Sequence, residues 1–106
     1  MRIITRSDVE RLLPVDACVD VMRAAMIATS KRDITLPIRQ FMPVPEGSGK
    51  MAIMPGTLGD PACFGIKLVC KYDRPLDDPL GTHVGMVLLF DSVKGCLLYT
   101  SDAADE

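Results

Sequence analysis

The chain has 106 residues, 48% of them hydrophobic and 25% charged, and a formal net charge of −2. That length allows one domain at most, and the composition is globular rather than disordered. Because the chain has no Lys/Arg cluster and no tryptophan, we expect no nucleic-acid partner. The longest apolar run, Val84 to Phe90, is too short to span a membrane, and the N-terminus lacks a signal-peptide pattern, so we expect a cytoplasmic protein.

The first third of the chain predicts one short strand and two helices. Arg2 to Thr5 is rich in β-branched residues, as a strand would be. Ser7 and Glu10 have the spacing of a capping box, which opens a short helix that Pro14 ends. Pro14 then suits the first turn of a second helix, which we expect to run to about Ser30. The apolar stripe of that helix is formed by Val15, Cys18, Val19, Met22 and Met26.

From Pro37 onward the pattern changes to the alternation typical of strands. The two strongest strands are Ala62 to Lys71 and Thr82 to Asp91, with a polar, proline-rich loop between them. Further predicted features are a strand at 38–44, a turn at 45–49, a strand at 51–54, a loop at 56–61 and a hairpin turn at 91–95 with Gly95 left-handed. This order predicts an α+β fold, with two N-terminal helices packed on a mostly antiparallel sheet.

The cysteines and the single histidine do not predict a metal site. Cys18, Cys63, Cys70 and Cys96 have no C-x-x-C spacing, and one histidine cannot complete a zinc site. In a reducing compartment they act as small hydrophobes, and we expect Cys18 and Cys70 in the core.

Lys67 is the most informative residue, because it stands in the middle of an apolar strand. It shares a strand face with Gly65 and Val69, and a lysine there needs a compensating partner, which we interpret as a ligand. The alternative is a lysine whose stem crosses the sheet and whose head reaches solvent.

Other polar residues receive simpler interpretations. His83 is interpreted as a structural or dimer-facing histidine rather than a catalytic one. Asp77 and Asp78 are interpreted as a solvated turn rather than an acid–base dyad.

The last residues, Cys96 to Glu106, resemble the translation of a sequencing-library adapter. We therefore expect two parts: residues 1–95 as a partial domain, and residues 96–106 as non-native read-through. The alternative is a natural strand with an acidic tail, and Leu97 to Thr100 can form a strand in either case. On the first interpretation the chain is a fragment.

Several short stretches, in their order and spacing, resemble those of a known family. They are Met1–Ile4, Asp8–Pro14, Pro37–Arg39, Met54–Pro55, Gly65–Val69, Thr82–Gly85 and Leu88–Asp91. Over residues 1–95 they resemble the N-terminal half of the ornithine cyclodeaminase/mu-crystallin family. The resemblance implies a homodimer whose substrate-binding and dimerisation domain is joined to a Rossmann domain that holds NAD or NADP. This chain covers only the first part, and is truncated before the Rossmann domain.

The resemblance also implies roles for three residues. Arg39 matches the family arginine that binds the substrate α-carboxylate, as a guanidinium fork is suited to do; the alternative is an edge-strand arginine in water. Lys67 matches the lysine that contacts the substrate near the reacting carbon. Thr82 matches the threonine at the nicotinamide end of the cofactor; the alternative is a β-branched residue that starts a strand.

The implied function is an NAD(P)-dependent enzyme that converts ornithine to proline and ammonia. Relatives instead act as amino-acid dehydrogenases or ketimine reductases, or bind ligands without catalysis as mu-crystallin does. The sequence departs from the family around Thr82, where Pro79, Leu80 and Gly81 precede it and Val84 follows His83. The glycine-rich dinucleotide fingerprint and the family's catalytic aspartate are not found, so we expect no catalytic residue in this fragment and no turnover by it.

Overall fold

The computed structural model describes residues 1–102, and it contains two helices and seven strands within that range. The helices are α1 (Arg6–Leu12) and α2 (Val15–Ser30). The strands are β1 (Arg2–Ile4), β2 (Ile34–Thr35), β3 (Gln40–Pro43), β4 (Lys50–Gly59), β5 (Ala62–Lys71), β6 (His83–Phe90) and β7 (Leu97–Asp102).

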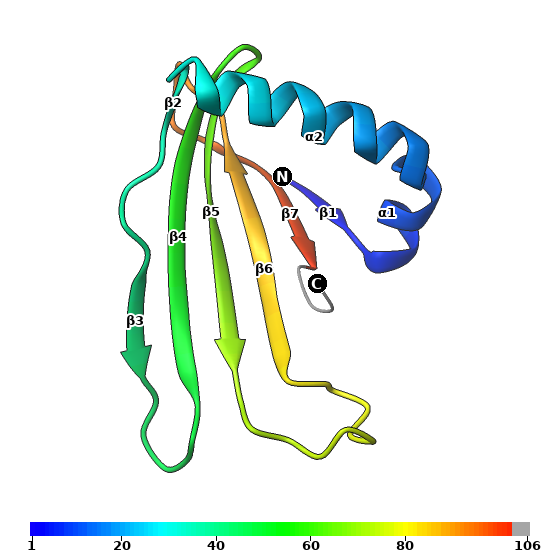
Figure 1. The fold of residues 1–106 in the computed structure, drawn as a ribbon, viewed down its shortest axis with the longest axis vertical. Coiled ribbons are helices and arrows are strands. Elements are labelled where there is room, and N and C mark those ends of the chain that lie inside the picture. The colour runs from blue at the N-terminus through cyan, green and yellow to red at the C-terminus, as the bar shows by residue number, and fades with distance from the viewer. Residues whose placement is uncertain (103–106) are drawn as a thin grey trace.

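The strands form one sheet in the order β1-β7-β6-β5-β4-β2, and β3 also pairs with β4 (Figure 1). All pairings are antiparallel except that of β1 with β7, which is parallel. The long strands β4 and β5 are paired over their whole length, from Lys50↔Lys71 to Gly59↔Ala62. The predicted α+β class, with two N-terminal helices on a mostly antiparallel sheet, is therefore confirmed.

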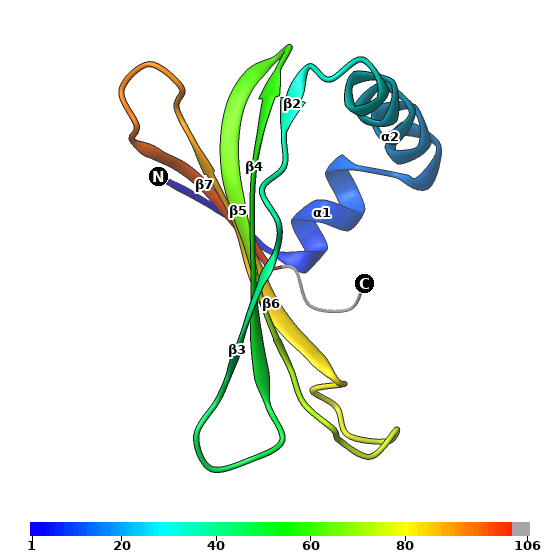
Figure 2. The same ribbon diagram turned by 60° about the vertical axis from the view of Figure 1, so that its left-hand side comes forward.

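Both helices lie on the same side of the twisted sheet (Figure 2). The core in the described range is thin, since Ala52 and Val69 are its buried hydrophobic residues, at 7% and 6% exposure. Within this part of the chain no helix is long and apolar enough to cross a membrane.

The predicted apolar stripe of α2 is not its buried face. Val15 is 81% exposed and Met26 is 64% exposed, so the expectation that this stripe packs on the sheet is wrong for residues 1–102. Cys18 is the one member of that stripe that is half-buried, and the other half-buried residues of α2 are the small residues Ala17, Ala25 and Ala28. Periodicity identifies a helix, but it does not decide which neighbour covers each side.

The capping box of α1 is formed by Thr5 and Asp8, and not by Ser7 and Glu10 as predicted. The Thr5 N–H donates to Asp8 Oδ2 at 2.9 Å, and the Asp8 N–H donates to Thr5 Oγ1 at 3.3 Å. Hydrogen bonds from the backbone and hydroxyl of Thr5, together with Arg11, lower the pKa of the Asp8 carboxyl below its ordinary value of 3.8. The helix therefore starts two residues earlier than the alternative cap would place it. Pro14 is the N-cap of α2 rather than its first helical residue.

β4 is longer than predicted, and this correction affects the site. The sequence predicts a loop at 56–61, yet residues 56–59 continue β4 by pairing with residues 62–65. The short strand β2 was not predicted, and β3 begins at Gln40 rather than Ile38. Pairing with the long, well-formed β5 outweighs the weak local preference of glycine for a strand.

Other predictions for the second half agree with the structure. β5 has the predicted bounds, and Gly95 adopts the expected left-handed conformation with φ of 72°. In the turn, the Gly95 N–H donates to the Asp91 carbonyl at 2.8 Å. Leu97 to Thr100 is part of a strand, β7. The assignment of residues 96–106 to adapter sequence stays a prediction, and 103–106 lie outside the described residues.

Candidate functional site

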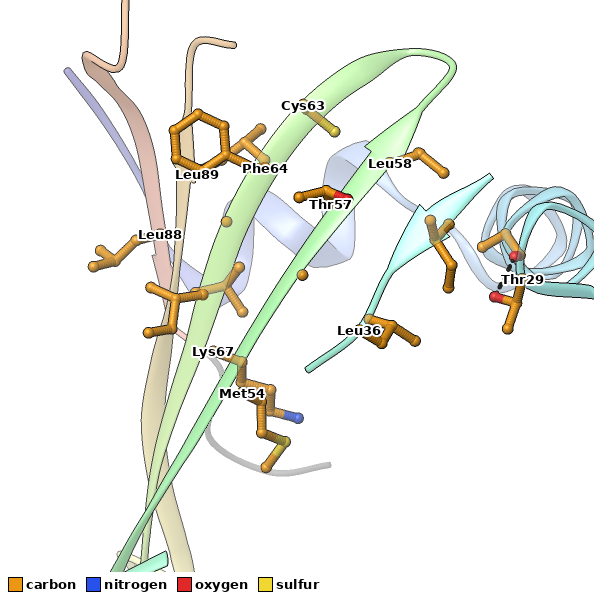
Figure 3. Close-up of a pocket in the computed structure, with 16 residues that line it drawn as sticks. Thr29, Leu36, Met54, Thr57, Leu58, Cys63, Phe64, Lys67, Leu88 and Leu89 are labelled. Atoms are coloured by element: carbon orange, nitrogen blue, oxygen red, sulfur yellow. Dashed lines mark hydrogen bonds between the residues drawn. The ribbon is translucent and has the colours of Figure 1, made fainter. Parts of the chain in front are cut away.

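Lys67 lies in the middle of β5, and it is paired with one residue on each of the two neighbouring strands. Met54 on β4 and Val87 on β6 are its register partners. Directly opposed residues project to the same face of a sheet, so these three side chains share one face. That face also carries Gly56, Gly65 and Leu89, which line a groove together with residues of α2. Figure 3 shows the side chains of Lys67 and Met54 running side by side.

The groove between α2 and the sheet has a volume of about 350 Å³. Ala25 and Thr29 line it from α2, and Ile34 and Leu36 line it from the segment that follows. Lys67 is the one charged side chain among the described residues that line it. A concave, mostly apolar site with one well-placed polar group is typical of small-molecule binding.

The floor of the groove is formed by two glycines. Gly56 and Gly65 are register partners, and they are the next pair along from Met54 and Lys67 on the same face. The two pairs are therefore roughly 7 Å apart, at about 3.3 Å per strand residue. A Cβ on Gly65 would lie 2.4 Å from the Leu88 carbonyl oxygen, so only glycine is accommodated there. A Cβ on Gly56 would meet the end of the Leu36 side chain at 2.9 Å.

Arg39 is exposed and lies one residue before β3. The first register pair of β3 is Gln40↔Ile53, and continuing this register by one residue places Arg39 beside Met54. Met54 is itself the partner of Lys67, so the backbones of Arg39 and Lys67 are two strand spacings apart, roughly 10 Å. Both side chains are long, and their joint contact with one small anion stays a prediction.

Thr82 lies elsewhere, at the end of the sheet where β6 begins. It is five residues before Val87, the β6 partner of Lys67, or roughly 16 Å along the strand. It does not line the groove, so an amino-acid-sized ligand held by Lys67 does not also contact Thr82.

Thr82 is nevertheless held in place by several contacts. Its Oγ1 is 2.8 Å from His83 Nδ1, and its carbonyl accepts from the Tyr72 N–H at 2.9 Å. Arg74 braces the preceding residue, since its Nη1 donates to the Gly81 carbonyl at 2.9 Å. The guanidinium of Arg74 also lies 4.7 Å from the centre of the Tyr72 ring. This positions one half-buried hydroxyl, next to a half-buried imidazole, at the end of the sheet.

The contacts of Asp78 agree with the interpretation of Asp77 and Asp78 as turn residues. Asp78 Oδ1 accepts from the Leu80 N–H at 2.9 Å, and the Asp78 N–H donates to Pro75, as expected for a turn. Across residues 1–102 there is no group of His, Cys, Asp and Glu residues that could hold a metal ion. Sequence reasoning missed Gly56, because it was assigned to a loop, and Leu36, which was assigned to no element. Gly65 was placed on the face of Lys67 but was not predicted as part of a site.

A model of the ornithine cyclodeaminase/mu-crystallin family matches residues 1–104. The chain belongs to this family. A search among curated protein sequences found no match.

Several solved structures share the fold of this chain. One is Δ1-pyrroline-2-carboxylate reductase of Thermococcus litoralis in complex with NADH and L-proline, with a TM-score of 0.87 at 24% identity over 96% of this chain. An archaeal alanine dehydrogenase dimer with bound NAD has a TM-score of 0.82 at 22% identity over 96% of this chain. A probable ornithine cyclodeaminase of Bordetella pertussis has a TM-score of 0.80 at 20% identity over 97% of this chain.

The similarity to these three structures establishes the fold of this chain of the ornithine cyclodeaminase/mu-crystallin family. The chain covers 32%, 31% and 30% of those three proteins, so it spans about a third of their length.

Proposed function

We propose that this chain is the substrate-binding part of an NAD(P)-dependent enzyme that oxidises an amino acid or reduces the corresponding imine. The observation that carries the proposal is the position of Lys67 in a concave apolar groove, paired with Met54. The register of β3, continued by one residue, would put Arg39 on the other side of Met54. Family membership supports the proposal, as do two solved structures of similar fold, a reductase with NADH and a dehydrogenase with NAD.

In this proposal the two cations bind the carboxylate of the substrate. An arginine can donate two parallel hydrogen bonds to a carboxylate, and a lysine adds a point charge at a second angle. Together they fix the carboxylate, and hence the direction in which the α-carbon hydrogen points. Orientation of this kind is a large part of the rate enhancement in a hydride-transfer reaction.

Among the described residues, Thr82 is the one that we propose contacts the cofactor. The Thr82 hydroxyl can donate or accept a hydrogen bond and so can contact an amide such as that of nicotinamide. Residues 1–102 contain no glycine-rich turn between a strand and a helix, so we propose that most of the cofactor is bound by residues outside this range. When bound, NAD(P) supplies the acceptor or donor of the hydride.

The proposed reaction balances in both directions. On oxidation, the α-carbon loses a hydride, the attached nitrogen loses a proton, and a carbon–nitrogen double bond forms. The reverse adds a hydride to carbon and a proton to nitrogen. Cyclisation of ornithine to proline with loss of ammonia is a specific form of this chemistry, and it stays one candidate among several.

The test uses the full-length protein that contains this chain. The purified protein is incubated with NAD⁺ or NADP⁺ and single L-amino acids, and formation of the reduced nicotinamide is followed by absorbance. Lys67→Met should raise the KM for the amino acid at least tenfold, because the charge-assisted contact to the carboxylate is lost. Lys71→Met, on the same strand and face, is the matched control and should leave the KM unchanged. Absence of turnover with every amino acid would refute the proposal.

We also propose that the protein acts as a homodimer. The sheet face opposite the helices carries Ile66, Leu68 and Leu88, and no element among residues 1–102 covers it (Figure 2). The archaeal alanine dehydrogenase is described as a dimer, which supports this proposal. Light scattering of the full-length protein should give twice the protomer mass, and Leu68→Glu should shift it toward the monomer.

A further inference from the structure

We propose that Arg74 is a positioning residue for the cofactor end of the site, because it holds the peptide group that precedes Thr82. This inference rests on the proposed function, in which Thr82 contacts the cofactor, and it adds the residue that fixes Thr82 in place. Arg74 does not line the groove, so it would act on the reaction through Thr82.

The contact that carries the inference joins Arg74 to the carbonyl of Gly81. Arg74 Nη1 donates to this oxygen at 2.9 Å, and the contact is partly buried. The Gly81 carbonyl and the Thr82 N–H belong to one planar peptide group, so a partner that holds the oxygen fixes the plane of that group. A hydrogen bond with a charged donor is stronger than one between neutral groups, which suits it to this task.

The Thr82 backbone is held on its other side by the sheet. Its carbonyl accepts from the Tyr72 N–H at 2.9 Å, one step beyond the last register pair of β5 and β6, Lys71↔His83. With the peptide groups before and after Thr82 both held, the direction of its Cα–Cβ bond is fixed as well. The contact of Oγ1 with His83 Nδ1, at 2.8 Å, then favours one rotamer of the side chain.

Arg74 is itself held in place by Tyr72. Its guanidinium carbon lies 4.7 Å from the centre of the Tyr72 ring, within the range of a cation–π contact. The ring covers Gly49, in the turn between β3 and β4, where an added Cβ would overlap the ring. Gly49 is buried, and its carbonyl accepts from the Val44 N–H at 3.0 Å. A chain of contacts therefore runs from the β3–β4 turn through Tyr72 and Arg74 to the Thr82 peptide.

The rest of the loop between β5 and β6, at the end of the sheet away from α2, does not replace this contact (Figure 1). Among the described residues, the hydrogen bonds of Pro75, Asp78 and Leu80 stay within the loop, and the Leu76 side chain is fully exposed. Gly81 has a φ of 65°, and a glycine can leave that conformation easily. We therefore expect the loss of Arg74 to release the Thr82 peptide and to leave the sheet intact.

The first test uses steady-state kinetics of the full-length protein. Arg74→Ala should raise the KM for NAD(P) about fivefold and leave the KM for the amino acid, at saturating cofactor, unchanged. Arg74→Lys keeps a cation and a donor, so it should recover part of this loss. Arg23→Ala, at an exposed arginine of α2, is the matched control and should change neither KM. An unchanged KM for NAD(P) in Arg74→Ala would overturn the inference.

A double-variant cycle separates positioning from a general loss of stability. Arg74→Ala combined with Thr82→Ala should be no worse than Thr82→Ala alone, because the hydroxyl that Arg74 positions is already absent. If Arg74 only stabilised the fold, the two losses would add.

The last test needs no turnover. In amide hydrogen exchange of the full-length protein, Arg74→Ala should speed the exchange of the Tyr72 N–H about tenfold, because its acceptor on Thr82 is released. The amide of Val69, in the middle of β5, should keep its rate. Unchanged exchange at Tyr72, or additive losses in the cycle, would overturn this inference and leave the proposed function standing. Absence of turnover with every amino acid would refute the proposed function and, with it, the role of Arg74 toward the cofactor.

Discussion

Thr82 and His83 are joined through their side chains, with Thr82 Oγ1 2.8 Å from His83 Nδ1. This contact fixes the rotamer of the one hydroxyl that the family resemblance assigns to the cofactor. If Thr82 contacts the cofactor as proposed, His83 would act through Thr82 as a positioning residue, since it does not line the groove. The geometry favours the structural interpretation of His83 given from the sequence, which stays a prediction.

The first prediction concerns this pair. His83→Ala should raise the KM for NAD(P) about fivefold, since one hydrogen bond contributes about 1 kcal/mol. Thr82→Ala should have a similar or larger effect, and the double variant should be no worse than Thr82→Ala alone. Steady-state kinetics on the four proteins of this cycle, at saturating amino acid, provide the measurement. Additive losses would show that His83 does not act through Thr82.

The second prediction concerns Arg39. Arg39→Ala should raise the KM for the amino acid about tenfold or more, with little change in the KM for the cofactor, because a charge-assisted hydrogen bond to the carboxylate is removed. Arg23→Ala is the matched control, since Arg23 is an exposed arginine of α2 paired only with Asp20 at 3.5 Å. Unchanged saturation by the amino acid in Arg39→Ala would contradict the assigned role.

The third prediction separates the two glycines of the groove floor. Gly65→Ala forces a Cβ against the Leu88 carbonyl, which is backbone and cannot move away, so it should lower the free energy of unfolding by about 1–3 kcal/mol. In Gly56→Ala the added Cβ meets a side-chain methyl of Leu36, which can move. The free energy of unfolding should therefore fall by less than about 1 kcal/mol. Chemical denaturation of both variants beside wild type gives the measurement. Equal losses would argue against the distinction between backbone and side-chain contacts.

The fourth prediction concerns pH and the N-terminus of α1. The pKa of Asp8 is lowered in the folded state by hydrogen bonds from Thr5 and by Arg11. A lowered pKa stabilises the fold above the ordinary value of 3.8, and this contribution is lost as the pH falls through the folded value. An NMR titration of the Asp8 carboxyl carbon should therefore give a midpoint below 3.8.

The control for this titration comes from two further variants. Thr5→Ala should raise the titration midpoint of the Asp8 carboxyl, because the Thr5 hydroxyl no longer donates a hydrogen bond to it. Asp20→Asn, on α2, should leave it where it is. A midpoint for Asp8 at or above its ordinary value would show that the capping box does not form in solution.

Parts of the fold that depend on local pattern were predictable from the sequence. The bounds of β5 follow from the alternation around Lys67, and the left-handed Gly95 follows from the hairpin turn. The start of α1 was not, because Thr5 and Ser7 are both good cap residues and only the geometry chooses between them.

Parts that depend on distant pairing were not predictable. Gly56 and Gly59 favour a loop in isolation, but their partners in β5 place them in β4. Because of this wrong loop prediction, the floor of the groove was not predicted, although Lys67 was predicted to contact a ligand. The apolar stripe of α2 shows the same limit, because periodicity reveals a hydrophobic face and not the surface that meets it.

The parallel pairing of β1 with β7 has a consequence for the order of folding. β1 has no other strand neighbour in residues 1–102, so its ladder hydrogen bonds wait until Leu97–Asp102 has left the ribosome. The β4–β5–β6 ribbon that carries Lys67 pairs strands that are consecutive in the chain and needs no such delay. During synthesis the sheet face that carries Lys67 can thus assemble first, and the N-terminal strand joins the sheet among the last elements.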